Sequence, residues 1–185
     1  NNFLRLHRAE RLYPFPENFF NTFLKTISQI DFRYYPYVHS LKEKISEKFN
    51  LSPHNVFINN GSSENIRIFY EAFAIENENV LITKPSYPMH KIYAEIRNSN
   101  LKYVSYKEDL TLNIDQMIQN IDNSLCCICF ANPNSPVGDI IDKKTIEKIL
   151  EKANKYKIPV LLDEAYIEYS NQSSCVNLLD KFDNL

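Results

Sequence analysis

The chain has 185 residues, 44% of them hydrophobic, with a formal net charge of −2 and a sequence pI near 6.1. This length is enough for one ordinary hydrophobic core. Because there is no basic excess to neutralise phosphates, nucleic acid is not expected as a partner. No apolar run approaches the roughly 20 residues that cross a membrane, and residues 1–10 are too polar for a signal peptide, so no membrane association is expected.

Residues 1–36 differ in composition from the rest of the chain. They are rich in aromatic residues and proline, as in "LYPFPENFF" at residues 12–20. We expect this segment to be an arm that packs on another surface, and residues 37–185 to form the main domain. The latter begins with "HSLKEKISEKF" (39–49), a predicted helix whose apolar residues recur every fourth position.

Beyond residue 50 the chain alternates between short apolar runs and amphipathic stretches. The apolar runs predict strands at 55–58, 79–83, 101–106, 125–130 and 158–162. The stretches between them predict helices at 62–74, 87–98, 113–121 and 142–156. Strands that alternate with helices are typical of a mostly parallel sheet with helices on both faces. The predicted fold class is therefore α/β.

The chain has four cysteines, and three of them lie in the predicted strand "LCCICF" (125–130). Cys126 and Cys129 have C-x-x-C spacing, but residues i and i+3 of a strand point to opposite faces. We therefore expect buried structural thiols. Free thiols are typical of a reducing compartment, so a cytoplasmic location is expected.

Two groups of candidate functional residues follow predicted strands. Asp163 ends the apolar run 158–162, and a buried carboxylate requires a cationic or hydrogen-bonding partner from the protein or a ligand. Gly61, Ser62 and Ser63 join a strand to a helix, with Ser62 as the predicted N-cap. Such a turn either binds an anion such as phosphate or only caps the helix.

Two further loops also follow strands. Tyr87 lies between Ser86 and Pro88, where it either stacks on a ligand ring or packs on the surface. In "NPNSPVG" (132–138) two prolines hold the preceding residues extended, which either aims an amide at a ligand or only forms a turn. Ligands of open α/β sheets bind beyond the carboxyl ends of strands. The features together predict a site for a phosphorylated aromatic ring with a basic nitrogen.

The ordered motifs "NNGSSE", "KPSYPMHKIYAE", "NPNSPVG" and "DEAYIEY" resemble fold-type I pyridoxal-phosphate enzymes of the class I/II aminotransferases. The similarity is greatest to the histidinol-phosphate aminotransferase branch and extends from about Leu4 onward. It implies a pyridoxal 5'-phosphate cofactor, a small-molecule amino donor (an amino acid or amino-phosphate), an oxo-acid acceptor, a role in amino-acid biosynthesis and a homodimer.

The resemblance also implies roles for individual residues. Asp163 would pair with the pyridinium nitrogen and keep it protonated. Tyr166 would hydrogen-bond the phenolic oxygen of the ring, and Tyr87 would stack on the ring.

The cofactor phosphate would be held by residues of both subunits. Gly61, Ser62 and Ser63 would bind it from one subunit. Tyr35, preferred over Tyr34 because it precedes a proline, would reach it from the other.

Two substitutions depart from the family pattern. The family has Asn immediately before P-T-G, where this chain has Ser135, so either Asn134 or Ser135 would take the usual role of that Asn. In the N-terminal segment, arginines replace an Asn-rich substrate stretch, so Arg8 and Arg11 would contact an anionic substrate.

The Schiff-base lysine of the family has no counterpart in the chain. Lys181 lies only on the approach to its expected position. We therefore expect the chain to be the N-terminal half of the enzyme, ending before that lysine. The alternatives are a decarboxylase of the same branch and a non-catalytic binding module of the same fold.

Overall fold

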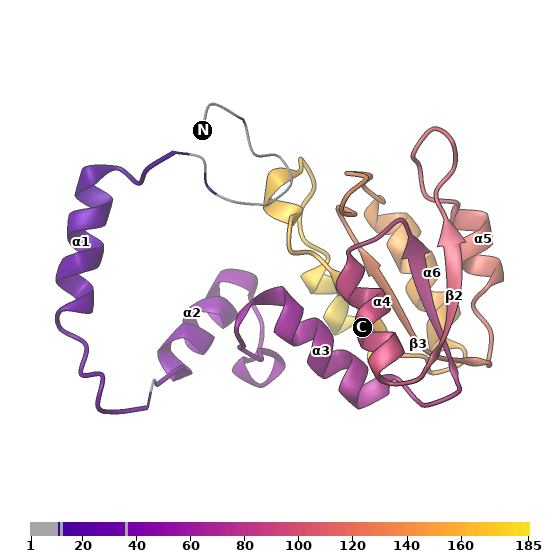
Figure 1. Ribbon diagram of the computed structural model, residues 1–185, viewed down its shortest axis with the longest axis horizontal. Helices are drawn as coiled ribbons and strands as arrows, with labels where there is room; N and C mark the ends of the chain where they lie inside the picture. The colour runs from indigo at the N-terminus through magenta and orange to yellow at the C-terminus, as the bar shows by residue number, and fades with distance from the viewer. Residues whose placement is uncertain (1–10, 12, 36) are drawn as a thin grey trace. The chain divides into compact units, whose positions relative to one another are not determined.

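The computed structural model describes residues 11, 13–35 and 37–185 (Figure 1). The chain divides into two compact units, Asn1–Ser40 and Leu41–Leu185, and each is described by itself below.

The described part of the first unit is dominated by helix α1 (Glu17–Ile27). Pro16 precedes the helix, Glu17 lies in its first turn and Lys25 in its last, where each charge complements the helix dipole. No residue of α1 is buried, and the rings of Phe15 and Phe19 stack with their centroids 4.9 Å apart. The unit therefore exposes an aromatic surface.

The second unit contains a sheet of four parallel strands in the order β2-β1-β3-β4. Their bounds are β1 (Asn79–Lys84), β2 (Asn100–Ser105), β3 (Leu125–Ala131) and β4 (Val160–Asp163). The α-helices are α2 (His39–Phe49), α3 (Gly61–Phe73), α4 (Pro88–Ile96), α5 (Ile114–Gln119) and α6 (Lys143–Asn154). Short 3-10 turns are η1 (Pro53–Asn55), η2 (Ile167–Tyr169) and η3 (Val176–Asp180). The predicted α/β class is confirmed.

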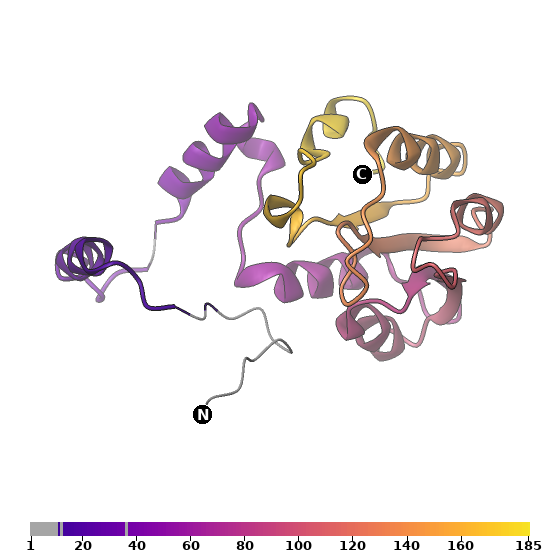
Figure 2. The same cartoon turned by 90° about the horizontal axis from the view of Figure 1, so that it is seen from above.

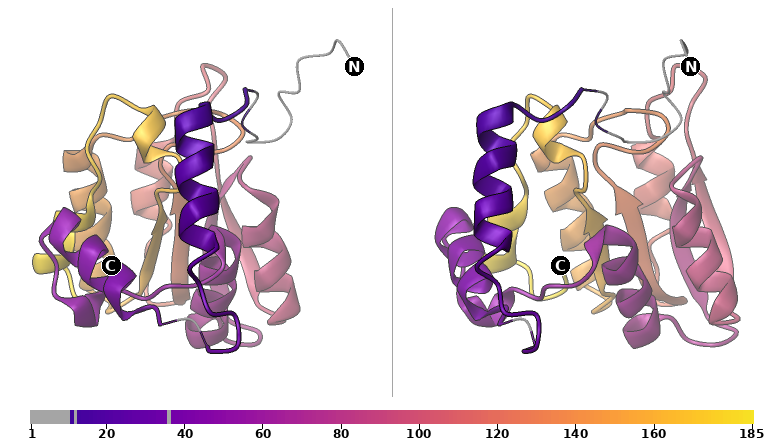
Figure 3. Two further views of the ribbon diagram at one scale, coloured as in Figure 1. Left: turned by 90° about the vertical axis from the view of Figure 1, so that its left-hand side faces the viewer. Right: turned by 60° about the vertical axis from the view of Figure 1, so that its left-hand side comes forward.

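Helices cover both faces of the sheet (Figures 2 and 3). Alternate residues of β1 point to opposite faces, so Ile82 packs with α3 and α4, and Leu81 packs with α5 and α6. The α6 side is the larger cluster and includes Phe130 and Ile149, both with no exposed surface. Burial of an Ile or Phe side chain stabilises a fold by about 1.5–3 kcal/mol, so these two clusters stabilise the sheet from both faces.

One strand prediction was wrong. Residues 56–58 form no strand in the structure, and the 3-10 turn η1 extends to Asn55. Val56 has an extended backbone, with φ −110° and ψ 122°, as its branched side chain favours. A strand also requires a neighbour to complete its ladder, and none pairs with this segment among the described residues.

The expectation about the cysteines is confirmed, because all four are free and buried. No helix in the described ranges is long and apolar enough to span a bilayer.

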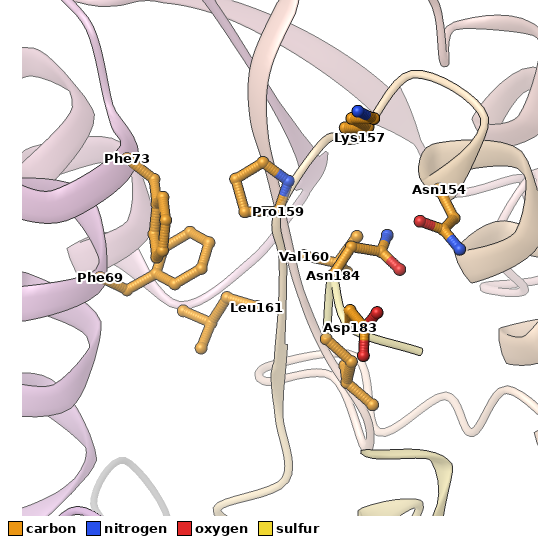
Figure 4. Close-up of a pocket in the computed structure, with 10 residues that line it drawn as sticks. Phe69, Phe73, Asn154, Lys157, Pro159, Val160, Leu161, Asp183 and Asn184 are labelled. Atoms are coloured by element: carbon orange, nitrogen blue, oxygen red, sulfur yellow. The ribbon is translucent and has the colours of Figure 1, made fainter. Parts of the chain in front are cut away.

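The outer edge of β4 borders a groove of about 540 Å³ (Figure 4). Asn184 closes one end of this edge, since its carbonyl accepts from Val160 N at 2.7 Å and its Nδ2 donates to Ile158 O at 3.0 Å. Phe69 and Leu161 line the groove, so it is largely apolar.

Candidate active site

A small pocket of about 70 Å³ lies at the carboxyl ends of the strands. Its walls come from the start of α3 and from the segments that follow β1, β3 and β4: Ser62, Tyr87, Ala131, Pro133, Ser135, Asp163, Ala165 and Tyr166. Residues that are up to about a hundred positions apart in the sequence meet there because the strands are parallel and end at the same edge. Five of the candidate site residues are thus brought together: Ser62, Tyr87, Ser135, Asp163 and Tyr166.

Asp163 is the last residue of β4, next to Ala131 of β3 in the ladder. Its side chain is 11% exposed. Oδ1 accepts a hydrogen bond from Ala165 N at 2.9 Å, and the backbone carbonyl accepts one from Asn132 N at 2.9 Å. The sheet and the following turn thereby hold a nearly buried carboxylate at the pocket.

His90 lies behind this carboxylate, with Nε2 3.8 Å from Asp163 Oδ2. The His90 side chain has no exposed surface, and neither ring nitrogen has a hydrogen-bond partner among the described residues. Burial lowers the pKa of His90 below 6.5, and the negative charge of Asp163 opposes this shift without reversing it. The contact is therefore between a carboxylate and a neutral imidazole, at a distance longer than a hydrogen bond.

Sequence reasoning missed His90. The available signal was its spacing from Tyr87, because residues i and i+3 at the start of a helix lie on neighbouring positions of one face. The two rings meet edge to face, with centroids 6.4 Å apart and an interplanar angle of 88°.

Tyr87 is the N-cap residue of α4 and packs against the cluster on the α3 side of the sheet. Its hydroxyl lies 3.0 Å from Ser63 Oγ, where either group can donate. This contact connects Ser63 to the loop that carries Tyr87. The neighbouring residue, Ser62, lines the pocket.

Helix α3 begins at Gly61, whose φ of +78° favours glycine. The predicted N-cap was wrong by two positions, because Asn60 is the N-cap residue and Ser62 lies inside the first turn. The Asn60 side chain makes no capping hydrogen bond. The first turn of this helix therefore keeps backbone N–H groups that no side-chain cap satisfies.

The loop after β3 uses its two asparagines internally. Asn132 bonds Ile141 in both directions, with Nδ2 3.1 Å from Ile141 O and Oδ1 2.8 Å from Ile141 N. Asn134 Nδ2 donates to Pro85 O at 2.9 Å, in the loop that precedes Tyr87. Ser135, in contrast, lines the pocket. Of the two candidates at this position, the serine lines the same pocket as Asp163.

Tyr166 lines the pocket from the turn after β4 and is 37% exposed. It also borders an adjoining cavity of about 340 Å³, which Ser135 and Tyr169 share.

Other predicted residues lie elsewhere or outside the described ranges. Arg8 is outside the described residues. Arg11 is exposed, donates from Nε to Tyr13 O at 2.8 Å and lies over the Phe15 ring. Tyr35 belongs to the first unit and is 99% exposed. Lys181 follows η3, and its Nζ lies 3.1 Å from Glu147 Oε2 of α6 in an ion pair. Within the described ranges no group of His, Cys, Asp or Glu side chains is arranged to hold a metal ion.

Comparison with known proteins places this arrangement in a family. The sequence model of the aminotransferase class I and II family matches residues 8–184. The chain therefore belongs to that family. It is 33% identical to histidinol-phosphate aminotransferase 1 of Carboxydothermus hydrogenoformans, over 98% of this chain and 52% of the relative. It is 32% identical to the histidinol-phosphate aminotransferase of Caldanaerobacter subterraneus, over 98% and 51%.

The fold is similar to that of solved aminotransferases. The histidinol-phosphate aminotransferase from Clostridium acetobutylicum superposes with a TM-score of 0.75 at 26% identity, over 91% of this chain and 50% of that one. The chain thus spans about half the length of the curated relatives that it matches.

Proposed function

We propose that the protein is a pyridoxal-phosphate-dependent aminotransferase that moves an amino group from a small amino acid or amino-phosphate to an oxo acid. The observation that carries this proposal is the nearly buried carboxylate of Asp163 at the strand ends, in one pocket with Tyr87, Tyr166 and the first turn of α3. Membership of the aminotransferase family and the names of the relatives support it.

The residues present fit pyridoxal 5'-phosphate in their chemistry. A carboxylate that is 11% exposed requires a cationic or hydrogen-bonding partner, and a protonated ring nitrogen supplies both. The uncapped first turn of α3, with Ser62 on the pocket wall, suits a phosphate. Two tyrosines on the same pocket suit a flat aromatic ring.

When bound, pyridoxal 5'-phosphate supplies an aldehyde carbon for the amino group and a ring that withdraws electrons. In our proposal Asp163 would keep a proton on the ring nitrogen, and a protonated ring withdraws electrons better than a neutral one. Tyr166 donates a hydrogen bond to the phenolic oxygen, and Tyr87 packs on the ring. Ser135 takes the role that the family gives to Asn, because it lines the pocket, while Asn134 stays a weaker candidate because its amide donates to Pro85 O.

The phosphate end of the site is part of the same proposal. Gly61, Ser62 and Ser63 bind the phosphate through backbone N–H groups and hydroxyls at the start of α3. The Ser63 hydroxyl is within hydrogen-bonding distance of Tyr87, so phosphate binding and the placement of the ring are linked.

We also propose how the rest of the chain serves this reaction. Residues 1–36 form an arm and residues 37–185 form most of the cofactor domain. The protein acts as a homodimer in the cytoplasm, and Tyr35 reaches the cofactor phosphate of the partner subunit. Arg8 and Arg11 contact an anionic group of the substrate. The exposed aromatic side chains of α1 and the full exposure of Tyr35 support a partner surface for this segment.

The test is amino-group transfer by the complete protein that contains this chain. Histidinol phosphate and its unphosphorylated form, histidinol, are offered as donors with a 2-oxo acid, and the new amino acid is measured. Transfer that depends on pyridoxal 5'-phosphate supports the proposal, and preference for the phosphorylated donor assigns the amino-phosphate class. Absence of transfer from these two donors and from a set of small amino acids contradicts it.

A further inference from the structure

We infer that Ser135 determines which rings the cofactor pocket accepts. Its short side chain leaves the phenolic-oxygen side of the ring open to the adjoining cavity, and this cavity takes a small neutral substituent on that oxygen. The inference rests on the proposed function and goes beyond it, because it concerns a position at which this chain departs from the family pattern.

The first observation is that the two cavities share a wall. Pro133, Ser135 and Tyr166 line both the pocket of about 70 Å³ and the adjoining cavity of about 340 Å³. Ser62 and Asp163 line only the smaller pocket. Because Tyr166 is the residue proposed to hydrogen-bond the phenolic oxygen, the shared wall lies at that side of the ring, away from the residues proposed for the ring nitrogen and the phosphate.

The second observation is the size of the side chain at this boundary. Ser135 has a single oxygen beyond Cβ, whereas Asn, the residue of the family pattern, has a whole carboxamide group there. The serine hydroxyl can still donate from the wall, but it does not occupy the volume of a carboxamide. A small side chain leaves free space where its surroundings do not collapse around it.

The loop that carries Ser135 is held by its own hydrogen bonds. Asn134 N donates to Asp139 O at 3.0 Å, and Gly138 N donates to Asn134 O at 2.6 Å. Pro136 restricts the backbone directly after Ser135. These bonds resist a movement of the loop toward the ring, so the space beside Ser135 stays open.

The third observation is the chemistry of the adjoining cavity. The described residues that line it include no charged side chain. Pro136 and Ile140 form its apolar part, and Tyr169 and Ser170 add hydroxyl groups. Tyr169 is 89% exposed, so its ring can move aside without the loss of buried contacts. Because an unpaired charge is costly to bury, such walls favour a neutral group such as a methyl ether.

The experiment compares two ligands on the complete apo protein. One is pyridoxal 5'-phosphate, and the other is its methyl ether, in which a methyl group replaces the phenolic hydrogen. Fluorescence titration gives both Kd values, and the result is the ratio of the ether Kd to the pyridoxal 5'-phosphate Kd. We expect a ratio of about 5 in wild type, because the ether oxygen accepts a weaker hydrogen bond.

Ser135→Asn should raise this ratio at least about 10-fold, because the carboxamide and the methyl group compete for one space. Ser135→Ala keeps the opening and removes the hydroxyl, so its ratio should stay at the wild-type value. The matched control is Ser173→Asn, the same substitution at an exposed residue that lines neither cavity. It should leave both Kd values unchanged.

An unchanged ratio in Ser135→Asn, or an equal rise in Ser135→Ala, would overturn the role of Ser135. Wild type gives a test that no misfolded variant can obscure, because a wild-type ratio of about 50 or more would show that the space is closed. The two proposals also fail differently. Wild type that binds neither ligand contradicts the proposed function, whereas wild type that binds pyridoxal 5'-phosphate and rejects the ether contradicts only this inference.

Discussion

Replacement of Asp163 by Asn should weaken cofactor binding moderately and turnover severely. The substitution keeps the size of the side chain and removes its charge. Asn Oδ1 can still accept from Ala165 N, the bond that Asp163 makes at 2.9 Å, so the turn after β4 should persist. The perturbation is therefore confined to the partner of the ring nitrogen.

The magnitude follows from the burial of this carboxylate, which is 11% exposed. Two unit charges 4 Å apart attract by about 4 kcal/mol at an effective dielectric constant of about 20. Desolvation of both groups offsets part of this attraction, and a hydrogen bond to a charged group retains about 2 kcal/mol. Cofactor Kd should therefore rise about 30-fold. The loss in kcat should be larger, at least about 100-fold, since a neutral amide does not favour the protonated ring and an unprotonated ring is a weaker electron sink in the transition state.

Fluorescence titration of the complete apo protein with pyridoxal 5'-phosphate gives Kd, and the amino-transfer assay at saturating cofactor gives kcat. Asp183→Asn is the matched control, because Asp183 lines the groove beside β4 and is not among the residues that line the pocket. It should leave both values unchanged. An Asp163→Asn protein with wild-type kcat, or with a Kd within about threefold of wild type, would refute the role of this carboxylate.

Three further predictions concern stability and binding. Gly61→Ala should lower the free energy of unfolding by about 1 kcal/mol in urea titration, since φ is +78° there; an unchanged midpoint would show that the backbone relaxes. Ser63→Ala should weaken binding of inorganic phosphate by the complete apo protein about threefold, a modest hydrogen-bond loss, whereas an unchanged affinity would remove Ser63 from the phosphate site. The pKa of His90 is below 6.5 in the folded protein, so the unfolded chain takes up a proton first and the free energy of unfolding falls as pH drops below about 6.5. His90→Phe should reduce this dependence on pH. An unaltered dependence of the free energy of unfolding between about pH 7.5 and pH 5 would contradict the prediction.

The sheet and the location of the pocket were predictable because they follow from local patterns. Apolar runs of strand length alternated with amphipathic stretches, and this pattern alone indicates parallel strands covered on both faces. Residues at the ends of such strands meet at one edge, so Asp163 and Tyr87 could be placed together before any contact was known.

The failures concern features that depend on distant partners. Residues 56–58 have strand-forming side chains but no ladder among the described residues, and no local pattern reports the missing neighbour. Ser62 was predicted to be the N-cap residue of α3. The helix already begins at Gly61, and Asn60 is its N-cap residue. His90 resembled an ordinary helix residue, because its position 3.8 Å from Asp163 depends on how α4 packs across the sheet.

The pocket residues are also joined to one another across the loops that carry them. The end of β4 is bonded to the segment after β3, because Asn132 N donates to the Asp163 carbonyl at 2.9 Å. The segment after β3 is bonded to that after β1, because Asn134 Nδ2 donates to Pro85 O at 2.9 Å. The Asn134 amide, which the sequence analysis considered for ligand binding, thus connects two walls of the site.

A third contact extends this series to helix α3, since the hydroxyls of Tyr87 and Ser63 lie 3.0 Å apart. The groups proposed for the ring nitrogen, the ring face and the phosphate therefore belong to one hydrogen-bonded set of loops rather than to independent loops. Ordering flexible loops costs free energy upon binding, and loops that are already bonded to one another avoid part of that cost. The same connection explains why a substitution such as Asn134→Ala, made outside the pocket wall, should displace Tyr87 and weaken the site as a whole.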